Sequence, residues 1–223
     1  PFFPSRVEGD RIIGRGTCDA KGILAAEVAA VERLRTNGES RVGLLFVVGE
    51  ERDSAGALCA NEQPVGSRFF IDGEPTENKL VIGTKGTLRL EIIARGKAAH
   101  SAYPEMGESA ILKLIYLLDE IVRMPLPTDP ILGSSLCNIG TIQGGTKANV
   151  IPDSARAELM FRSVEPVEKL KARLEGVVAG RADLEYRFEV PVTMLNVVEG
   201  FETVAVSFAS DVPFLTNWGR PYL

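Results

Sequence analysis

The spacing of hydrophobic and polar residues changes once along the chain, at about residue 85. Before that point the pattern predicts the order strand, helix, strand, helix, strand. Residues 20–36 carry apolar positions at helical spacing, and residues 42–48 are almost wholly apolar, which is typical of a strand buried on both faces of a sheet. Residues 68–71 predict a further short strand. Together these segments predict a βαβ layer with some mixed edge strands.

After that point apolar and polar residues alternate with a period of two. The alternation covers residues 87–92, 156–162 and 184–190, and it indicates a sheet with one face in water. On the last of these strands the residues expected to share one face are Leu184, Tyr186, Phe188 and Val190.

Two helices are predicted within the same part of the chain, at residues 108–123 and 166–178. The order strand, helix, strand, strand, helix, strand is that of a ferredoxin-like split βαβ unit. On the first helix the expected apolar positions are Ile111, Leu114, Ile115, Leu118 and Val122.

Four acidic residues stand where strand-like segments stop and a loop or helix begins. They are Asp19, Glu50, Glu51 and Glu74. In an open α/β sheet this edge is where active sites assemble. Because carboxylate oxygens are hard ligands, such a set favours divalent metal ions and water activation.

Each of these acidic segments has a plainer interpretation. Asp19 lies in a glycine-rich turn before a helix, which also resembles a dinucleotide phosphate loop, but its carboxylate would repel a phosphate. Glu50 and Glu51 are adjacent, so both reach one site only if the strand ends there and the backbone turns; otherwise they form a solvated strand end. In an extended segment Asp72 would share a face with Glu74. Asp72 is therefore the alternative candidate for the site residue of this segment.

Six motifs, in this order, resemble the di-zinc aminoacylase, acetylornithine deacetylase, succinyl-diaminopimelate desuccinylase and glutamate carboxypeptidase family of metallopeptidases. The motifs are Gly14–Gly22, Leu44–Glu51, Ile71–Thr76, Gly83–Gly86, Ala98–Ser101 and Ala148–Asp153. The resemblance implies an α/β fold, in which a zinc-peptidase-like catalytic domain has a mostly parallel sheet with helices. It places this domain at residues 1–84 and 194–223, with a ferredoxin-like α+β lid and dimerisation domain inserted at residues 85–193.

The resemblance also implies roles for the acidic residues. Asp19 would bridge two zinc ions, for which cobalt or manganese can substitute, and Glu51 and Glu74 would each bind zinc. Glu50 would be the general base that takes a proton from the attacking water and returns it to the leaving amine. Family members commonly have a cis peptide after the bridging aspartate, here Asp19–Ala20. We expect this cis bond in the metal-loaded enzyme. Without metal, a relaxation to the trans form is left as an alternative.

In the lid the resemblance assigns three further residues. His100, the only histidine of the chain, would contact the transition state, in several family members from the partner subunit. Asn149 and Arg162 would bind the substrate's carboxylate or the oxyanion, since a guanidinium donates two parallel hydrogen bonds to a carboxylate. The alternative for Arg162 is a solvated residue on the wet face of its strand. A homodimer through the lid is expected.

The two zinc-binding histidines of the family are absent, and their expected positions fall just before Pro1 and shortly after Leu223. We therefore expect a fragment of a longer enzyme that is inactive alone, because each zinc would keep about two of the usual three or four protein ligands. The expected function is hydrolysis of N-acyl amino acids or small peptides, with deacylase and carboxypeptidase both open. The alternative is a non-catalytic dimerising or metabolite-binding fragment.

Composition changes this picture little. The 223 residues carry a net charge of −5, which argues against a nucleic-acid partner. No run of 18 or more apolar residues occurs, so a membrane span is not expected. Cys18, Cys59 and Cys137 fit no disulfide framework and are interpreted as free thiols. We expect a cytoplasmic protein, with secretion left open because a targeting segment would precede Pro1.

Overall fold

The computed structural model describes residues 4–223 of the protein. The chain forms two compact units. Unit 1 contains residues up to Ile82 together with Leu195–Val204 and Ser210–Leu223, and unit 2 contains Gly83–Met194 and Ala205–Ala209.

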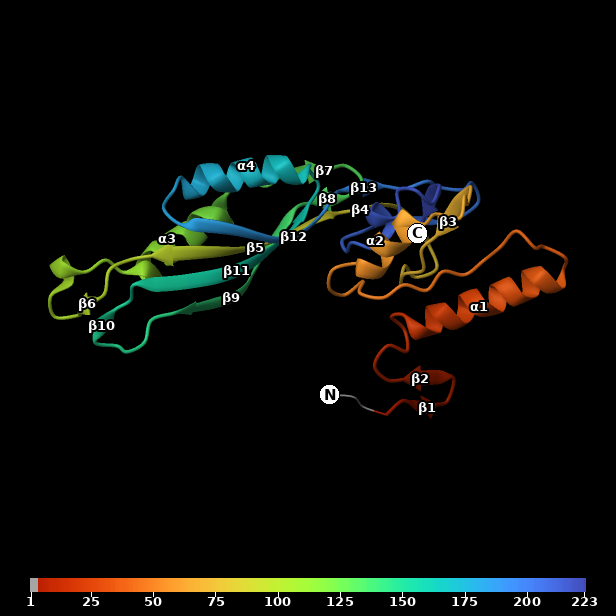
Figure 1. Ribbon diagram of the computed structural model, residues 1–223, viewed down its shortest axis with the longest axis horizontal. Helices are drawn as coiled ribbons and strands as arrows, with labels where there is room; N and C mark the ends of the chain where they lie inside the picture. Colours follow the sequence, from red (N-terminus) through yellow and green to blue (C-terminus); the bar gives the residue numbers. More distant parts are fainter. Residues whose placement is uncertain (1–3) are drawn as a thin grey trace. The chain divides into compact units, whose positions relative to one another are not determined.

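Unit 2 is built on a four-stranded antiparallel sheet with two helices on one face (Figure 1). The strand order is β12-β5-β11-β9. The elements are β5 (Gly86–Arg95), α3 (Ala110–Arg123), β9 (Leu136–Gly144), β11 (Ser154–Ser163), α4 (Val167–Val178) and β12 (Asp183–Val190). This order of strands and helices confirms the predicted split βαβ unit.

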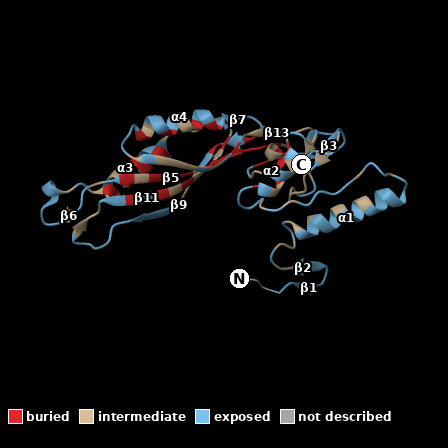
Figure 2. Cartoon of the chain, viewed as in Figure 1, coloured by how far each residue is buried: buried red, intermediate tan, exposed pale blue. Residues whose placement is uncertain are grey.

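The core of unit 2 lies between the sheet and the two helices, where the buried residues of Figure 2 gather. The alternation predicted for the central strands is confirmed, because Leu88, Leu90 and Ile92 of β5 are fully buried. Across the sheet, Ala157 and Leu159 of β11 are directly paired with β5 residues and are fully buried as well. Burying these apolar side chains stabilises the unit by about 25 cal/mol for each Å² removed from water.

Helix α3 buries only part of the stripe that was expected. Ile115 and Val122 are 49% and 59% exposed, whereas Leu117 and Ile121 are almost completely buried. Leu114 and Leu118 are buried as predicted. The helix is apolar on more than one side, so its periodicity alone could not decide which side packs against the sheet. Ser109 caps it by accepting a hydrogen bond from the Leu112 N–H.

Strand β12 also departs from the expected pattern. Its pairing with β5 shifts between Tyr186 and Phe188, so that Tyr186 lies opposite Leu90 but Phe188 lies opposite Arg89. The shift is a β-bulge, which adds one residue and turns the following side chains to the other face. The prediction that Phe188 and Val190 share the face of Tyr186 is therefore wrong.

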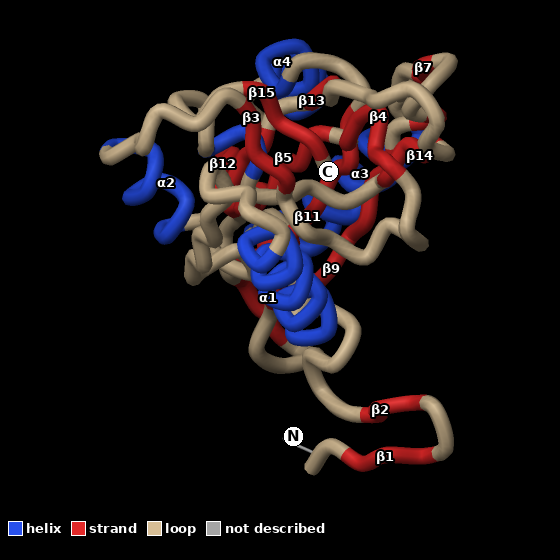
Figure 3. Tube along the Cα trace, turned by 90° about the vertical axis from the view of Figure 1, so that its right-hand side faces the viewer, coloured by secondary structure: helices blue, strands red, loops and turns tan. Residues whose placement is uncertain are grey.

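Unit 1 holds shorter elements. Helices α1 (Lys21–Thr36) and α2 (Ala55–Glu62) confirm the helical patterns. A hairpin joins β1 (Arg6–Glu8) to β2 (Arg11–Ile13), and β3 (Phe69–Ile71) pairs in parallel with β15 (Arg220–Tyr222), beside which it lies in Figure 3. The η2 turn covers Val212–Phe214.

The prediction of a strand at residues 42–48 is wrong. These residues have no regular secondary structure, and Phe46 and Val48 are 55% and 76% exposed. A buried strand needs hydrogen-bonding neighbours and a covering layer on each face. Within residues 4–223 the segment pairs with no strand, so its apolar composition alone does not make it one.

The remaining strands are short. Strand β4 (Leu80–Thr84) lies between β13 (Thr193–Met194) and β14 (Thr203–Val206). Two further antiparallel pairs are β6 with β10 and β7 with β8, and η1 is a single 3-10 turn. Their bounds are Ala99–His100 (β6), Val150–Ile151 (β10), Thr128–Asp129 (β7), Gly133–Ser134 (β8) and Pro104–Met106 (η1). Among the described residues, no helix has both the length and the apolar character needed to cross a bilayer. The three cysteines are free thiols, as predicted.

Candidate active site

The glycine-rich motif forms a tight turn that leads into α1. The backbone N–H of Lys21 donates to the Gly16 carbonyl at 2.8 Å, and that of Gly22 donates to the Thr17 carbonyl at 3.1 Å. A Cβ at position 22 would stand 2.5 Å from the Thr17 carbonyl oxygen, so only glycine fits there. The turn places Asp19 directly before the helix.

The peptide bond between Asp19 and Ala20 is cis. The resemblance implied this bond, and the structure confirms it.

The Glu50–Glu51 pair lies in a turn, as both glutamates would need in order to approach one site. Gly49 has φ 92°, and its carbonyl accepts hydrogen bonds of 2.8–3.0 Å from the backbone N–H groups of residues 52–54. This turn follows the irregular segment 42–48, and α2 starts four residues after Glu51. The two side chains are therefore not forced to opposite faces, as they would be in a continuing strand.

Glu50 interacts with carboxylates from three other segments. Its pKa is raised to about 7, first by partial burial and then by the negative charges of Asp211, Glu51, Asp19 and Asp72. Desolvation and like charge both disfavour the ionised form. Glu50 thus lies within electrostatic range of carboxylates from segments distant in the sequence.

Glu74 belongs to the same group. Its pKa is raised to about 8, first by burial and then by the negative charges of Asp72, Glu50, Asp19 and Asp211. Glu74 therefore lies within electrostatic range of Asp19 and Glu50, and their assignment to one metal site stays a prediction. The structure also adds two residues: Asp72, which was the alternative to Glu74, and Asp211, which the sequence reasoning missed.

The only signal for Asp211 in the sequence is its setting. It follows Ser210 inside the largely apolar stretch 203–215, where a carboxylate is unusual. In the structure Asp211 is 3% exposed, and its Oδ1 atom has no hydrogen-bond partner. Burial is the main cause that raises its pKa.

The donor set of this carboxylate group suits a hard divalent cation. Asp72 Oδ2 and Asp211 Oδ1 are buried and accept no hydrogen bond, so both oxygens are available for a cation or its water. Across residues 4–223, however, no three histidine, cysteine, aspartate or glutamate side chains are arranged to hold a metal ion. The chemistry of the donors fits a metal, but the described residues do not complete its ligand set.

In unit 2 the structure brings His100 and Asn149 together. His100 lies opposite Val150 in the β6–β10 pair, and the Ser101 N–H donates to the Asn149 carbonyl at 3.0 Å. The His100 Nδ1 atom accepts a hydrogen bond from the Ala102 N–H at 3.1 Å. This contact assigns the ring proton to Nε2, which is then the nitrogen that can donate to a ligand.

Arg162 lies at the other end of the sheet from this pair. Its guanidinium donates to the Thr87 hydroxyl at 2.6 Å, at the start of β5. Thr87 and Arg95 are eight residues apart on β5, which corresponds to about 27 Å of strand. His100 follows the far end of that strand, so one copy of unit 2 does not present Arg162 and His100 to the same small molecule.

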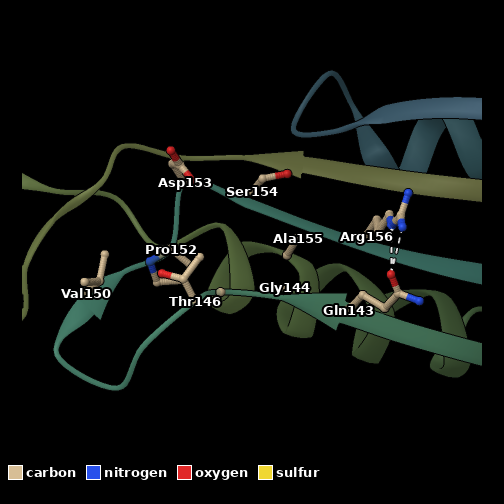
Figure 4. A pocket seen from close by; sticks show the side chains of 10 residues that line it. Gln143, Gly144, Thr146, Val150, Pro152, Asp153, Ser154, Ala155 and Arg156 are labelled. Carbon is tan, nitrogen blue, oxygen red and sulfur yellow. Dashed lines mark hydrogen bonds between the residues drawn. The ribbon is translucent and has the colours of Figure 1, made fainter.

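A groove of about 420 Å³ lies beside the loop that carries Asn149 (Figure 4). On its wall Arg156 donates hydrogen bonds of 2.8 and 3.2 Å to the side-chain oxygen of Gln143. Its lining consists of Gln143, Gly144, Gly145, Thr146, Val150, Pro152, Asp153, Ser154, Ala155 and Arg156. The groove contains none of the carboxylates described above.

Several known proteins are similar to the chain. Residues 82–187 match the peptidase dimerisation domain model of the M20 family. The chain is 39% identical to a peptidase M20 domain-containing protein of Schizosaccharomyces pombe, over 97% of this chain and 56% of that protein. It is 36% identical to a probable carboxypeptidase of Aspergillus flavus, over 96% of this chain and 58% of that protein.

A solved structure supports the fold independently. An M20 family metallo-carboxypeptidase from Sulfolobus solfataricus matches with a TM-score of 0.74 and 16% identity, over 97% of this chain and 70% of that one. The chain spans somewhat more than half the length of the two curated relatives described above. Together with the order of the motifs, these similarities identify residues 82–187 as an M20-type peptidase dimerisation domain, and the chain is similar to M20 family peptidases over nearly its whole length.

Proposed function

We propose that the complete native protein is a metal-dependent hydrolase of amide bonds, acting on N-acyl amino acids or small peptides. The observation that carries this proposal is the convergence of carboxylates around Glu50 and Glu74, in the motif order of the family. Asp19 is the proposed bridge between two zinc ions, and Glu51 and Glu74 are the proposed ligands. The remaining ligands come from groups that the described residues do not supply.

When bound, the metal ions would polarise the amide carbonyl and lower the pKa of water. Glu50 takes a proton from the attacking water and passes it to the leaving nitrogen. Its place in the turn after Gly49 leaves it free for this, because the ligand role falls to its neighbour Glu51. Low dielectric around the partly buried carboxylates strengthens their interaction with any charge that develops nearby.

Metal analysis beside a hydrolysis assay tests this proposal. The complete native protein is expected to contain divalent metal and to hydrolyse an N-acetyl amino acid or a dipeptide. A chelator should abolish the activity, and added Zn²⁺, Co²⁺ or Mn²⁺ should restore it. Preference between the two substrates would distinguish a deacylase from a carboxypeptidase. A protein that binds no metal and cleaves neither substrate would instead be a non-catalytic dimerising or metabolite-binding protein.

We further propose that the protein is a homodimer through an edge of the unit 2 sheet, and that two copies share each substrate. Strands β9 and β12 are the sheet's two edges, and the matched family domain is a dimerisation domain. Since Arg162 lies beside the start of β5 and His100 and Asn149 lie beyond its far end, residues that act on one substrate would come from different copies.

Subunit complementation tests the shared site. His100→Ala and Arg162→Ala are each expected to inactivate the protein. Mixing the two variants under conditions that exchange subunits should restore about a quarter of the wild-type activity, because half of the dimers are mixed and each mixed dimer has one intact site. Mixing His100→Ala with Asn149→Ala is the control. These residues share one location, so that mixture should stay inactive, and recovery there would contradict the assignment.

A further inference from the structure

Ser210 and Asp211 form a buried polar pair whose place in the structure calls for an explanation. Both residues are 3% exposed. Burying a carboxylate is costly unless it is paired or serves a bound ion. Asp211 satisfies only part of its hydrogen-bonding capacity, because its Oδ1 atom has no partner.

Each member of the pair is bonded to a different segment that carries the site's carboxylates. The Asp211 side chain is hydrogen-bonded to Ser54, which lies just after Glu50 and Glu51. The Ser210 side chain is hydrogen-bonded to Asp72. The pair therefore connects the turn that carries the two glutamates to the loop that carries Glu74.

Ser54 is in an unusual conformation for its position. It stands at the N-cap of α2, where a serine hydroxyl ordinarily accepts a hydrogen bond from the helix. Here the Ser54 side chain makes no such bond, and the residue has φ 53° while being 2% exposed. Non-glycine residues are uncommon in this region and persist where their surroundings hold them. The bond to Asp211 is such a restraint.

The segment that carries the pair is firmly anchored in unit 1. Beyond η2, the Trp218 indole donates to the Ala60 carbonyl at 2.9 Å, and the Asn217 N–H donates to the Asn61 side chain at 2.8 Å. Strand β15 then pairs with β3, and the Asp72 N–H donates to the Tyr222 carbonyl at 2.9 Å. Because the chain is fixed soon after η2, the position of the Ser210–Asp211 pair is restrained as well.

We propose that Asp211 is a positioning residue of the metal site. One of its oxygens fixes Ser54 and thereby the Glu50–Glu51 turn, and the unpartnered Oδ1 adds negative charge that retains the cation. The inference rests on the proposed function. It extends the site to a segment far along the chain from the six motifs, and it gives the unpartnered oxygen a role.

Metal affinity measured on the complete native protein tests the proposal. Wild type, Asp211→Asn and Ser54→Ala are stripped of metal, checked for native circular dichroism, and titrated with Zn²⁺ alone. Asp211→Asn keeps the shape and a hydrogen bond to Ser54 but loses the charge, whereas Ser54→Ala keeps the charge and loses the bond. Both should bind Zn²⁺ about 10- to 100-fold more weakly, the usual effect of removing a group that orients a ligand. The kcat values should fall in parallel.

Asp119→Asn is the matched control, because Asp119 pairs with Arg123 on the surface of α3 in unit 2. It should bind Zn²⁺ like wild type. Wild-type affinity in Asp211→Asn or in Ser54→Ala would overturn the positioning role while leaving the proposed function intact. If either Asp211→Asn or Ser54→Ala does not fold, the Zn²⁺ affinity of the other variant decides the test. A wild-type protein that binds no Zn²⁺ would overturn the proposed function and this inference together.

Discussion

Replacing Glu50 by glutamine is expected to reduce kcat by at least about 10²–10⁴-fold, the contribution of a positioned general base. A neutral amide has nearly the same shape as the carboxylate but cannot take a proton from water. The metal content should stay nearly unchanged, because the proposed ligand is the adjacent Glu51. Steady-state kinetics on an N-acetyl amino acid and a dipeptide, beside metal analysis of the same preparation, measure both quantities.

Glu51→Gln is the matched comparison, since it makes the same chemical change one residue along the same turn. It should weaken metal retention, because an amide is a neutral and poorer ligand than a carboxylate. Loss of metal in Glu50→Gln with full metal and activity in Glu51→Gln would mean that the two roles are reversed. If neither change affects hydrolysis, the metallohydrolase proposal fails.

Replacing Phe161 by alanine is expected to destabilise unit 2 by about 3–5 kcal/mol. Phe161 lies on β11, is 1% exposed and is among the largest fully buried side chains of the core. Its removal leaves a cavity between the sheet and helices α3 and α4, which the rigid packing of the core can close only in part. Native-state hydrogen exchange of the β5 amides measures this loss within unit 2.

Phe201→Ala is the control for this prediction. It removes the same side chain from a position that is 64% exposed in unit 1. Surface substitutions of this kind usually change stability by less than about 0.5 kcal/mol, so protection of the β5 amides should be unaffected. A loss below about 1 kcal/mol in Phe161→Ala would show that the core relaxes around the missing ring.

The candidate site could be predicted in part because its residues occur in short motifs. The turn at Gly49 and the turn before α1 are local structures, determined by glycines and nearby hydrogen bonds. Local chemistry therefore pointed to Asp19, Glu50 and Glu74. Asp211 could not be found in this way, because its burial and its bond to Ser54 depend on a segment that returns to unit 1 from far along the chain.

The sequence by itself determined the order of elements in unit 2, because alternation and helical spacing specify which segments can present an apolar face. It did not determine how those faces pair. The bulge after Tyr186 and the buried side of α3 became visible only in the structure, since each depends on a neighbouring strand or on the sheet as a whole. The same reason explains residues 42–48. Apolar composition favours burial, but a strand forms only where another strand accepts its hydrogen bonds, and that is decided by tertiary structure.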